Sequence, residues 1–120
     1  YSDMGIMSAR MRMTLEALRG KETEHFRGIL TENYVAIALK TKGYDLHYWE
    51  SDNTAEVDFL IQKDSHVIPV ECKAGNHVKA KSMMVYMEKY DPVYAMRIST
   101  RNFGMVKGIK SVPLYSVFCI

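Results

Sequence analysis

Cysteine and long apolar runs are both scarce in this chain of 120 residues. No apolar run approaches the roughly 20 residues that a membrane-spanning helix requires, and no basic segment followed by an apolar stretch marks a signal peptide. The two cysteines, Cys72 and Cys119, lack CxxC spacing and lie in apolar, strand-like stretches. Reduced core thiols are therefore expected rather than a disulfide. These absences argue against membrane and disulfide-stapled secreted proteins and predict a cytoplasmic location.

Two site types are also missing. No loop of the form GxxxxGK[ST] is present, so no nucleotide cofactor is expected within this chain. The four histidines show no metal-ligand spacing, so none is assigned to a metal.

The net charge of +2 conceals an asymmetry. Residues 1–72 carry 8 Lys/Arg against 12 Asp/Glu, whereas residues 73–120 carry 8 Lys/Arg against only 2 acidic residues. An acidic cluster joined to a basic half suits a metal-dependent enzyme that acts on a polyanion. The alternative is that solvated faces simply differ in charge.

With 48% apolar residues, the chain can form one compact domain with its own core. Residues 1–22, which do not begin with Met, are expected to be a connecting segment, and residues 23–120 the domain. Hydrophobic periodicity predicts a helix from Thr23 or Glu24 to about Gly43 and a second helix over 80–90. Strands are expected at 44–49, 56–62, 67–73, 93–98 and 114–119. The predicted fold is α/β, with a mixed sheet of four to five strands flanked by helices on both faces and an α-β-β-β-α-β order.

The strand at 67–73 carries the chemistry. Strand alternation places Ile68, Val70 and Cys72 on one face and projects Glu71 and Lys73 side by side from the other. An ordinary surface ion pair is the simpler interpretation of Glu71 and Lys73 alone.

Asp58 lies on the preceding predicted strand. Alternation puts Val57, Phe59 and Ile61 on one face and Asp58 on the other, so a turn between the two strands can bring Asp58 near Glu71. Two carboxylates in a partly buried place repel each other unless a cation intervenes.

Mg²⁺ or Mn²⁺ suits such a site, because these ions take oxygen ligands and keep several waters. Lys73 would orient or deprotonate the attacking water, or pair with a phosphate oxygen. Glu32, which lies among apolar residues of the first helix, is a further candidate ligand. The alternatives are a buried Glu32 satisfied by a backbone amide or by Lys73, and a Lys73 that neutralises a vestigial acidic cluster.

Asp58, the sequence Glu71-Cys72-Lys73 and the helical Glu32 together resemble the E…D…ExK signature of the PD-(D/E)XK superfamily, which includes restriction endonucleases and archaeal Holliday-junction resolvases. Val57 stands where the name of the motif has proline. The resemblance implies a restriction-endonuclease-like fold with Glu32, Asp58, Glu71 and Lys73 as active-site residues.

A closer resemblance covers nearly the whole chain. The segments 28–33, 43–44, 48–49, 56–59, 67–75, 81–82, 97–99 and 113–115 are similar to the C-terminal domain of unknown function of prokaryotic AAA-type ATPases. The opening residues 1–6 look like the segment that joins that domain to its ATPase part. The resemblance implies an ATPase part of the same polypeptide as a partner.

Lys79, Lys81 and Arg97 are the candidate nucleic-acid contacts, although solvated lysines are an equal alternative. The first functional hypothesis is a Mg²⁺-dependent nuclease-like domain that acts on DNA phosphodiesters. The second is a catalytically inactive module of the same fold that binds nucleic acid or mediates assembly, including homo-oligomers, of the parent ATPase.

Overall fold

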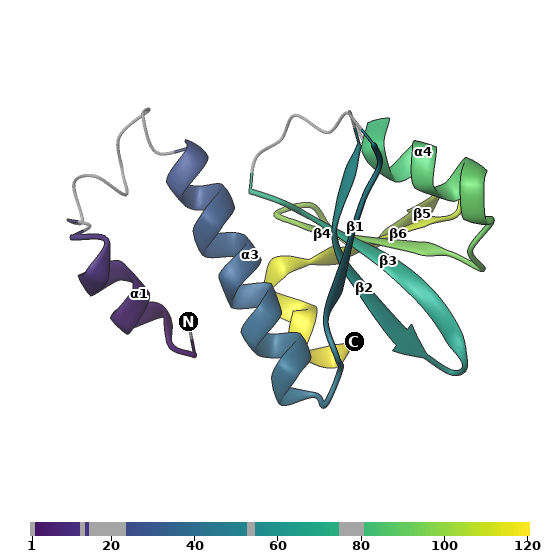
Figure 1. Ribbon diagram of the computed structural model, residues 1–120. Coiled ribbons are helices and arrows are strands. Elements are labelled where there is room, and N and C mark those ends of the chain that lie inside the picture. Colours follow the sequence, from purple (N-terminus) through teal and green to yellow (C-terminus); the bar gives the residue numbers. More distant parts are fainter. Residues whose placement is uncertain (1, 13, 15–23, 53–54, 75–80) are drawn as a thin grey trace.

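A six-stranded mixed sheet forms the centre of the computed structural model, with helices on both faces (Figure 1). The structure describes residues 2–12, 14, 24–52, 55–74 and 81–120. Its elements are α1 (Met4–Arg10), α3 (Glu24–Thr41), β1 (His47–Glu50), β2 (Glu56–Lys63), β3 (His66–Lys73), α4 (Lys81–Tyr90), β4 (Ala95–Ser99), β5 (Gly104–Val106), β6 (Ile109–Pro113) and η2, a 3₁₀-helix (Leu114–Cys119). The strand order is β1-β2-β3-β4-β6-β5.

Helix α3 covers one face of the sheet through a narrow stripe. Thr31, Val35 and Leu39 recur every fourth residue and are buried, and Val35 and Leu39 pack in a cluster with residues of β2, β3, β4, β6 and η2. The helix ends at Thr41, two residues before the predicted stop at Gly43, whose φ of +87° favours glycine and whose N–H donates to the Lys40 carbonyl. Glu32 is exposed, so the expectation that it lies within the buried surface is wrong. The apolar residues around it are only partly covered.

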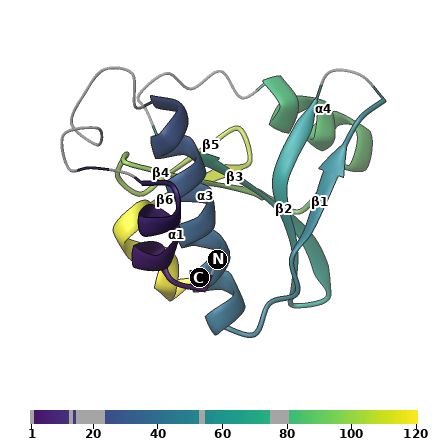
Figure 2. The same ribbon diagram turned by 60° about the vertical axis from the view of Figure 1, so that its left-hand side comes forward.

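The N-terminal helix α1 lies beside α3 (Figure 2). Met7 is buried, and the Asn33 side-chain amide bonds the sulfur of Met4 at 3.2 Å. The rest of the predicted connecting segment falls mainly outside the described residues.

Strands β1, β2 and β3 form the predicted antiparallel meander. The β2–β3 turn has positive φ at both Asp64 and Ser65, at 47° and 66°, which is the geometry of a tight hairpin turn. The predicted polar turn at 63–65 is confirmed.

Strand β2 does not alternate strictly. Its register against β1 shifts: His47 pairs with Leu60 and Trp49 pairs with Val57. Two residues of β1 therefore span three residues of β2. As a result Val57 packs in the core cluster under α4, while Phe59 and Ile61 pack in the cluster under α3. The prediction that these three residues share one face is wrong, because such an irregularity inserts an extra residue into one strand.

Strands β3, β4 and β6 run parallel, so their carboxyl ends lie at one edge of the sheet. Lys73 pairs in register with Ser99, and Ser99 pairs with Pro113. Helix α4 makes the predicted crossover from β3 to β4 and packs Met83 and Tyr86 on the face opposite α3.

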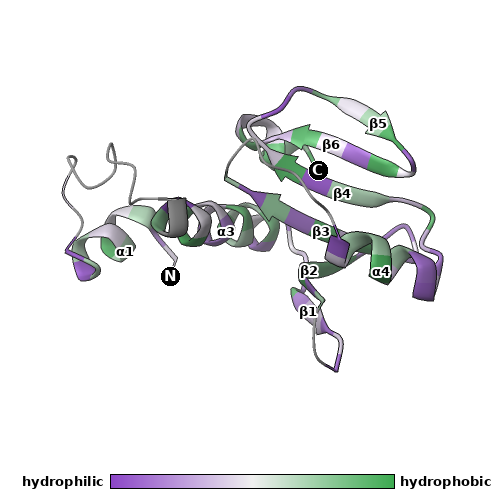
Figure 3. Cartoon of the chain, turned by 90° about the horizontal axis from the view of Figure 1, so that it is seen from above, coloured by the Kyte–Doolittle hydropathy of each residue, from purple (hydrophilic) through white to green (hydrophobic). Residues whose placement is uncertain are grey.

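The sheet exceeds the predicted four to five strands because β5 and β6 form a hairpin that the sequence analysis missed. Lys107 and Gly108 have positive φ values of 50° and 74° and make its turn. The predicted strand at 114–119 is instead η2, in which Cys119 is exposed rather than buried. Figure 3 shows hydrophobic and hydrophilic residues mixed along β4 and β6.

Within the described residues, no helix combines the length and the apolar character needed to cross a bilayer.

Candidate functional site

Glu71 is the buried charge at the centre of the candidate site. It is 4% exposed and lies on β3, on the face opposite Val70 and Cys72, which belong to the core cluster under α3. Its Oε1 lies 3.2 Å from Lys73 Nζ and its Oε2 lies 3.4 Å from Arg97 Nε. Each carboxylate oxygen is therefore ion-paired, which offsets the cost of burying this charge.

Asp58 joins the site through the backbone of β3. Its Oδ2 accepts a hydrogen bond of 2.6 Å from the Cys72 N–H. Towards the carboxyl end of β3, the last residue pair between β2 and β3 is Phe59 with Val70. The Cys72 N–H lies beyond this pair and is bonded by the Asp58 carboxylate in place of a backbone carbonyl. The strands can therefore separate here without leaving a buried N–H unpaired.

The pKa of Asp58 lies above its ordinary value. Burial is the largest cause; the Cys72 N–H and Lys73 lower the pKa, whereas Glu71 and Glu56 raise it. Asp58, Glu71 and Lys73 thus share one electrostatic environment, and the structure brings these three sequence candidates together where β2 and β3 part.

Glu32, the fourth sequence candidate, belongs to α3 and not to the strands. Its side chain is exposed on α3, although it is near enough to Cys72 for its charge to contribute to the raised pKa of that thiol, after burial and Asp58. Among residues 2–12, 14, 24–52, 55–74 and 81–120, no group of three or more His, Cys, Asp and Glu side chains is arranged to hold a metal.

The position of Arg97 was not predicted from the sequence. Arg97 was expected to contact phosphate, but its side chain is 14% exposed and is ion-paired with Glu71, its register partner across β3 and β4. The contact follows from the pairing of Arg97 with Glu71 on neighbouring parallel strands, and that pairing cannot be deduced from the sequence. Lys81 is exposed at the start of α4, and Lys79 lies outside the described residues.

Asp58 and Glu71 are the two carboxylates that this site offers as oxygen ligands. In phosphate-processing sites, Mg²⁺ is bound by one or two carboxylates together with phosphates and waters. Asp58 and Glu71 can supply the carboxylates. Glu71 would have to share one of its oxygens with the ion, since both already face cations.

Charge is separated along the strand order. Residues 43–62, which contain β1 and most of β2, include five acidic residues and no Lys or Arg, and residues 92–120 include four basic residues and no Asp or Glu. Because β1 and β5 are the two edges of the sheet, one edge is acidic and the other is basic.

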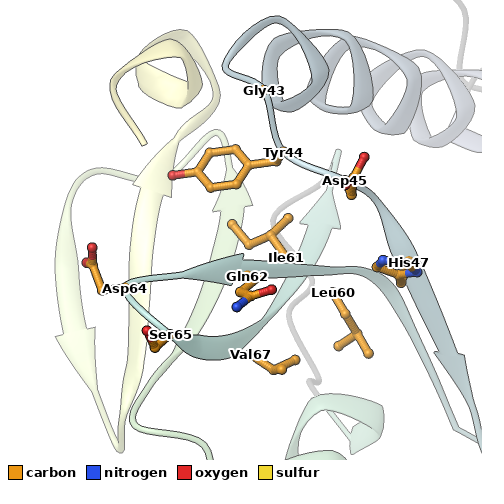
Figure 4. A pocket seen from close by; sticks show the side chains of 10 residues that line it. All are labelled: Gly43, Tyr44, Asp45, His47, Leu60, Ile61, Gln62, Asp64, Ser65 and Val67. Carbon is orange, nitrogen blue, oxygen red and sulfur yellow. The ribbon is translucent and has the colours of Figure 1, made fainter.

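A cavity of about 690 Å³ lies away from the candidate site (Figure 4). Its lining comes from the segment between α3 and β1, from the start of β1, and from β2 and β3 with the turn between them, and includes Tyr44, Asp45 and Asp64. That turn is at the amino end of β3, whereas Lys73 is at the carboxyl end. The cavity therefore contains none of the sequence candidates.

A second, open groove of about 410 Å³ lies at the carboxyl edge of the parallel strands. It is lined by Tyr34 of α3, by Thr100, which follows β4, and by Leu114 and Tyr115 of η2. Ser99, the strand partner of Lys73, directly precedes Thr100.

A comparison with protein families matches residues 27–117 to the domain of unknown function DUF4143. The chain belongs to the DUF4143 family. The match begins in α3, contains all six strands and ends within η2, so the DUF4143 domain includes Glu32, Asp58, Glu71, Lys73 and Arg97. Searches of curated proteins and of solved structures gave no match.

Proposed function

We propose that this DUF4143 domain is a Mg²⁺- or Mn²⁺-dependent nuclease-like domain that acts on DNA phosphodiesters, with a restriction-endonuclease-like fold. We further propose that it is the C-terminal module of an AAA-type ATPase. The observation that carries the proposal is the convergence of Asp58, Glu71 and Lys73 where β2 and β3 separate, with Asp58 held by the Cys72 amide. The order of these residues follows the D…ExK pattern.

The residues have distinct roles in this proposal. Asp58 and Glu71 would hold the cation, which when bound supplies a water of lowered pKa and neutralises charge on the phosphate. Lys73, with a side chain 35% exposed, can reach a bound phosphate or orient a water while still near Glu71. Arg97 pairs with the other oxygen of Glu71 and so holds the carboxylate in place.

The test is cleavage of single-stranded, double-stranded and branched DNA with Mg²⁺ or Mn²⁺ and with EDTA. Metal-dependent cutting is expected from the wild type and is expected to be lost in Asp58→Ala, Glu71→Ala and Lys73→Ala. Glu88→Ala, which changes an exposed acid on α4, is the matched control and should cut normally. Retained cutting in any site variant would remove that residue from the mechanism.

A catalytically inactive module is the second candidate function. It is favoured by the two cations that already occupy the oxygens of Glu71 and by the absence of a three-residue metal cluster among the described side chains. This candidate predicts no cleavage by a folded protein. It also predicts either salt-sensitive DNA binding that weakens when the exposed Lys81 is neutralised, or stable assembly of copies.

A further inference from the structure

The two edge strands of the sheet, β1 and β5, have no further strand beside them among the described residues. Figure 3 shows them at opposite ends of the sheet. An edge strand presents backbone N–H and C=O groups along one side, and a strand of another chain can pair with these groups. The sheet is therefore open to extension at both ends.

The backbone of Glu50 faces the open side of β1. The Ser51 N–H donates to the Ala55 carbonyl at 2.8 Å, so these two residues form a hydrogen-bonded pair at the end of β1 and β2. Bonded and non-bonded pairs alternate along an antiparallel ladder, and Glu50 pairs with Glu56 at the next position. The N–H and C=O of Glu50 therefore point away from β2.

The backbone of Met105 faces the open side of β5. Lys107 and Gly108 form a two-residue turn, and the residues that flank such a turn, Val106 and Ile109, are a hydrogen-bonded pair. By the same alternation, the N–H and C=O of Met105 point away from β6. Each open edge thus offers a donor and an acceptor to an added strand.

Exposed apolar side chains lie on the same face at both edges. Tyr48 is 78% exposed and Met105 is 60% exposed. Trp49 and Ile109, the partner of Val106, both pack in the cluster under α4. Strand alternation therefore puts their neighbours Tyr48 and Met105 on the other face, where a continued sheet would bring them together.

The charges of the two edges are opposite. Residues 45–52 contain three acidic residues and no Lys or Arg, whereas residues 101–108, all of them exposed, contain Arg101 and Lys107 and no Asp or Glu. Pairing of either edge with the same edge of a second copy would place like charges opposite each other, which is unfavourable. Pairing of β1 with β5 places opposite charges together.

From these observations we propose that the β1 edge of one copy of this chain pairs with the β5 edge of a second copy. Strands β1 and β5 run in opposite directions within the sheet, so a continued sheet makes them an antiparallel pair. The contact joins two different surfaces, so each added copy leaves one edge open, and assembly extends into a row or closes into a ring.

One register satisfies the backbone, the side chains and the charges together. When Tyr48 lies opposite Met105, the outward backbone groups of the two strands meet, and the sulfur of Met105 can contact the tyrosine ring. The same register places Asp52 opposite Arg101. The inference goes beyond both candidate functions, because it names the surface and the partner and holds whether or not the domain cuts DNA.

The first test is sedimentation velocity of the chain at micromolar to millimolar concentration. The wild type should form larger species as the concentration rises, and added salt should weaken this association. One variant, Glu50→Lys with Asp52→Lys, alters the β1 edge, and another, Arg101→Glu with Lys107→Glu, alters the β5 edge. Each should weaken association by about 5- to 500-fold, since it replaces attraction with repulsion at two positions.

A mixture of the two edge variants is the decisive sample. Each variant has one intact edge, so the mixture should regain the association that neither variant shows alone, which a misfolded variant could not do. The exposed residues Lys81 and Glu88 of α4 lie off both edges, so Lys81→Glu and Glu88→Lys, tested separately, should associate like the wild type.

A disulfide test checks the register. In a Cys119→Ser background, Tyr48→Cys and Met105→Cys chains are mixed and oxidised; directly opposed bonded residues have Cα atoms about 5.5 Å apart, which a disulfide can span. A cross-linked dimer is expected. Val93→Cys, at an exposed position outside both edge strands, replaces Met105→Cys in the control and should give none.

Three results would overturn the inference. The first is a wild type that stays monomeric in low salt, and the second is a mixture that does not regain association. The third is loss of association in one edge variant only, which would identify a symmetric interface. Metal-dependent cleavage by a monomeric wild type supports the nuclease and rejects edge pairing, whereas edge pairing without cleavage supports the inactive module.

Discussion

Arg97 Nε lies 3.4 Å from Oε2 of Glu71, although 26 residues separate them in the chain. The parallel register of β3 and β4 makes them direct neighbours. Their side chains are 14% and 5% exposed, so each charge depends on the other for compensation.

Removal of Arg97 should therefore destabilise the fold. Arg97→Leu is expected to lower the free energy of unfolding by about 1–3 kcal/mol, because Glu71 loses one of its two cations and keeps Lys73. Urea denaturation measures the change. Lys110→Leu, an exposed residue on neighbouring β6, is the control and should remain within about 0.5 kcal/mol of the wild type. Equal stability of the two variants would show that the pair is not important for folding.

Asp58 should make stability depend on pH. Its pKa in the folded state is raised above 3.8, mainly by burial, so the folded protein favours the neutral carboxyl. The wild type is therefore most stable relative to Asp58→Asn below pH 3.8 and loses that advantage as the pH rises through the folded pKa. Unfolding free energies of both proteins across this range provide the measurement. A difference that does not vary with pH would place Asp58 in an environment like that of water.

Binding of a divalent cation should offset the stability that is lost when Asp58 ionises. Mg²⁺ at a hundredfold excess over its Kd would stabilise the wild type by about 2.7 kcal/mol at neutral pH. Thermal unfolding should show a rise in Tm that is absent in Asp58→Asn and Glu71→Gln and preserved in Glu88→Gln. A similar rise in all four proteins would indicate non-specific binding of the ion.

Two glycines should respond to alanine in opposite directions. Gly108 has φ of +74° in the β5–β6 turn, and an added Cβ would lie 3.1 Å from Met87 Cε, so Gly108→Ala should cost about 1–2 kcal/mol. Gly28 lies within α3 with nothing within 4 Å of its added Cβ, so Gly28→Ala should stabilise by about 0.5–1 kcal/mol. Chemical denaturation checks both. A gain in stability for Gly108→Ala would contradict the hairpin geometry.

Periodicity predicted the regular parts of this fold. Helix α3 with its stop signal Gly43, the meander of β1 to β3 and the crossover through α4 all follow from local patterns of apolar residues and turn residues. The β5–β6 hairpin was missed because Lys107-Gly108 is a weak turn signal between short strands. The segment 114–119 has the apolar content of a strand, but it follows Pro113 and closes the core as a 3₁₀-helix.

The candidate site was predictable in part. Asp58, Glu71 and Lys73 were predicted from strand alternation and from the resemblance to the D…ExK signature, and the structure places them together. Strict alternation failed in β2, since the register irregularity moves Val57 to the other core cluster. The Arg97–Glu71 contact could not be predicted, because it depends on which strands are neighbours and in what register.

The separation of charge between the two edges of the sheet also affects how partners arrive. A polyanion that approaches β1 meets Glu50 and Asp52, whereas one that approaches β5 meets Arg101 and Lys107. A molecule with such a dipole rotates in the field of a polyanion before contact, so encounters begin at the basic edge. Added salt screens this field and therefore slows association more than it speeds dissociation.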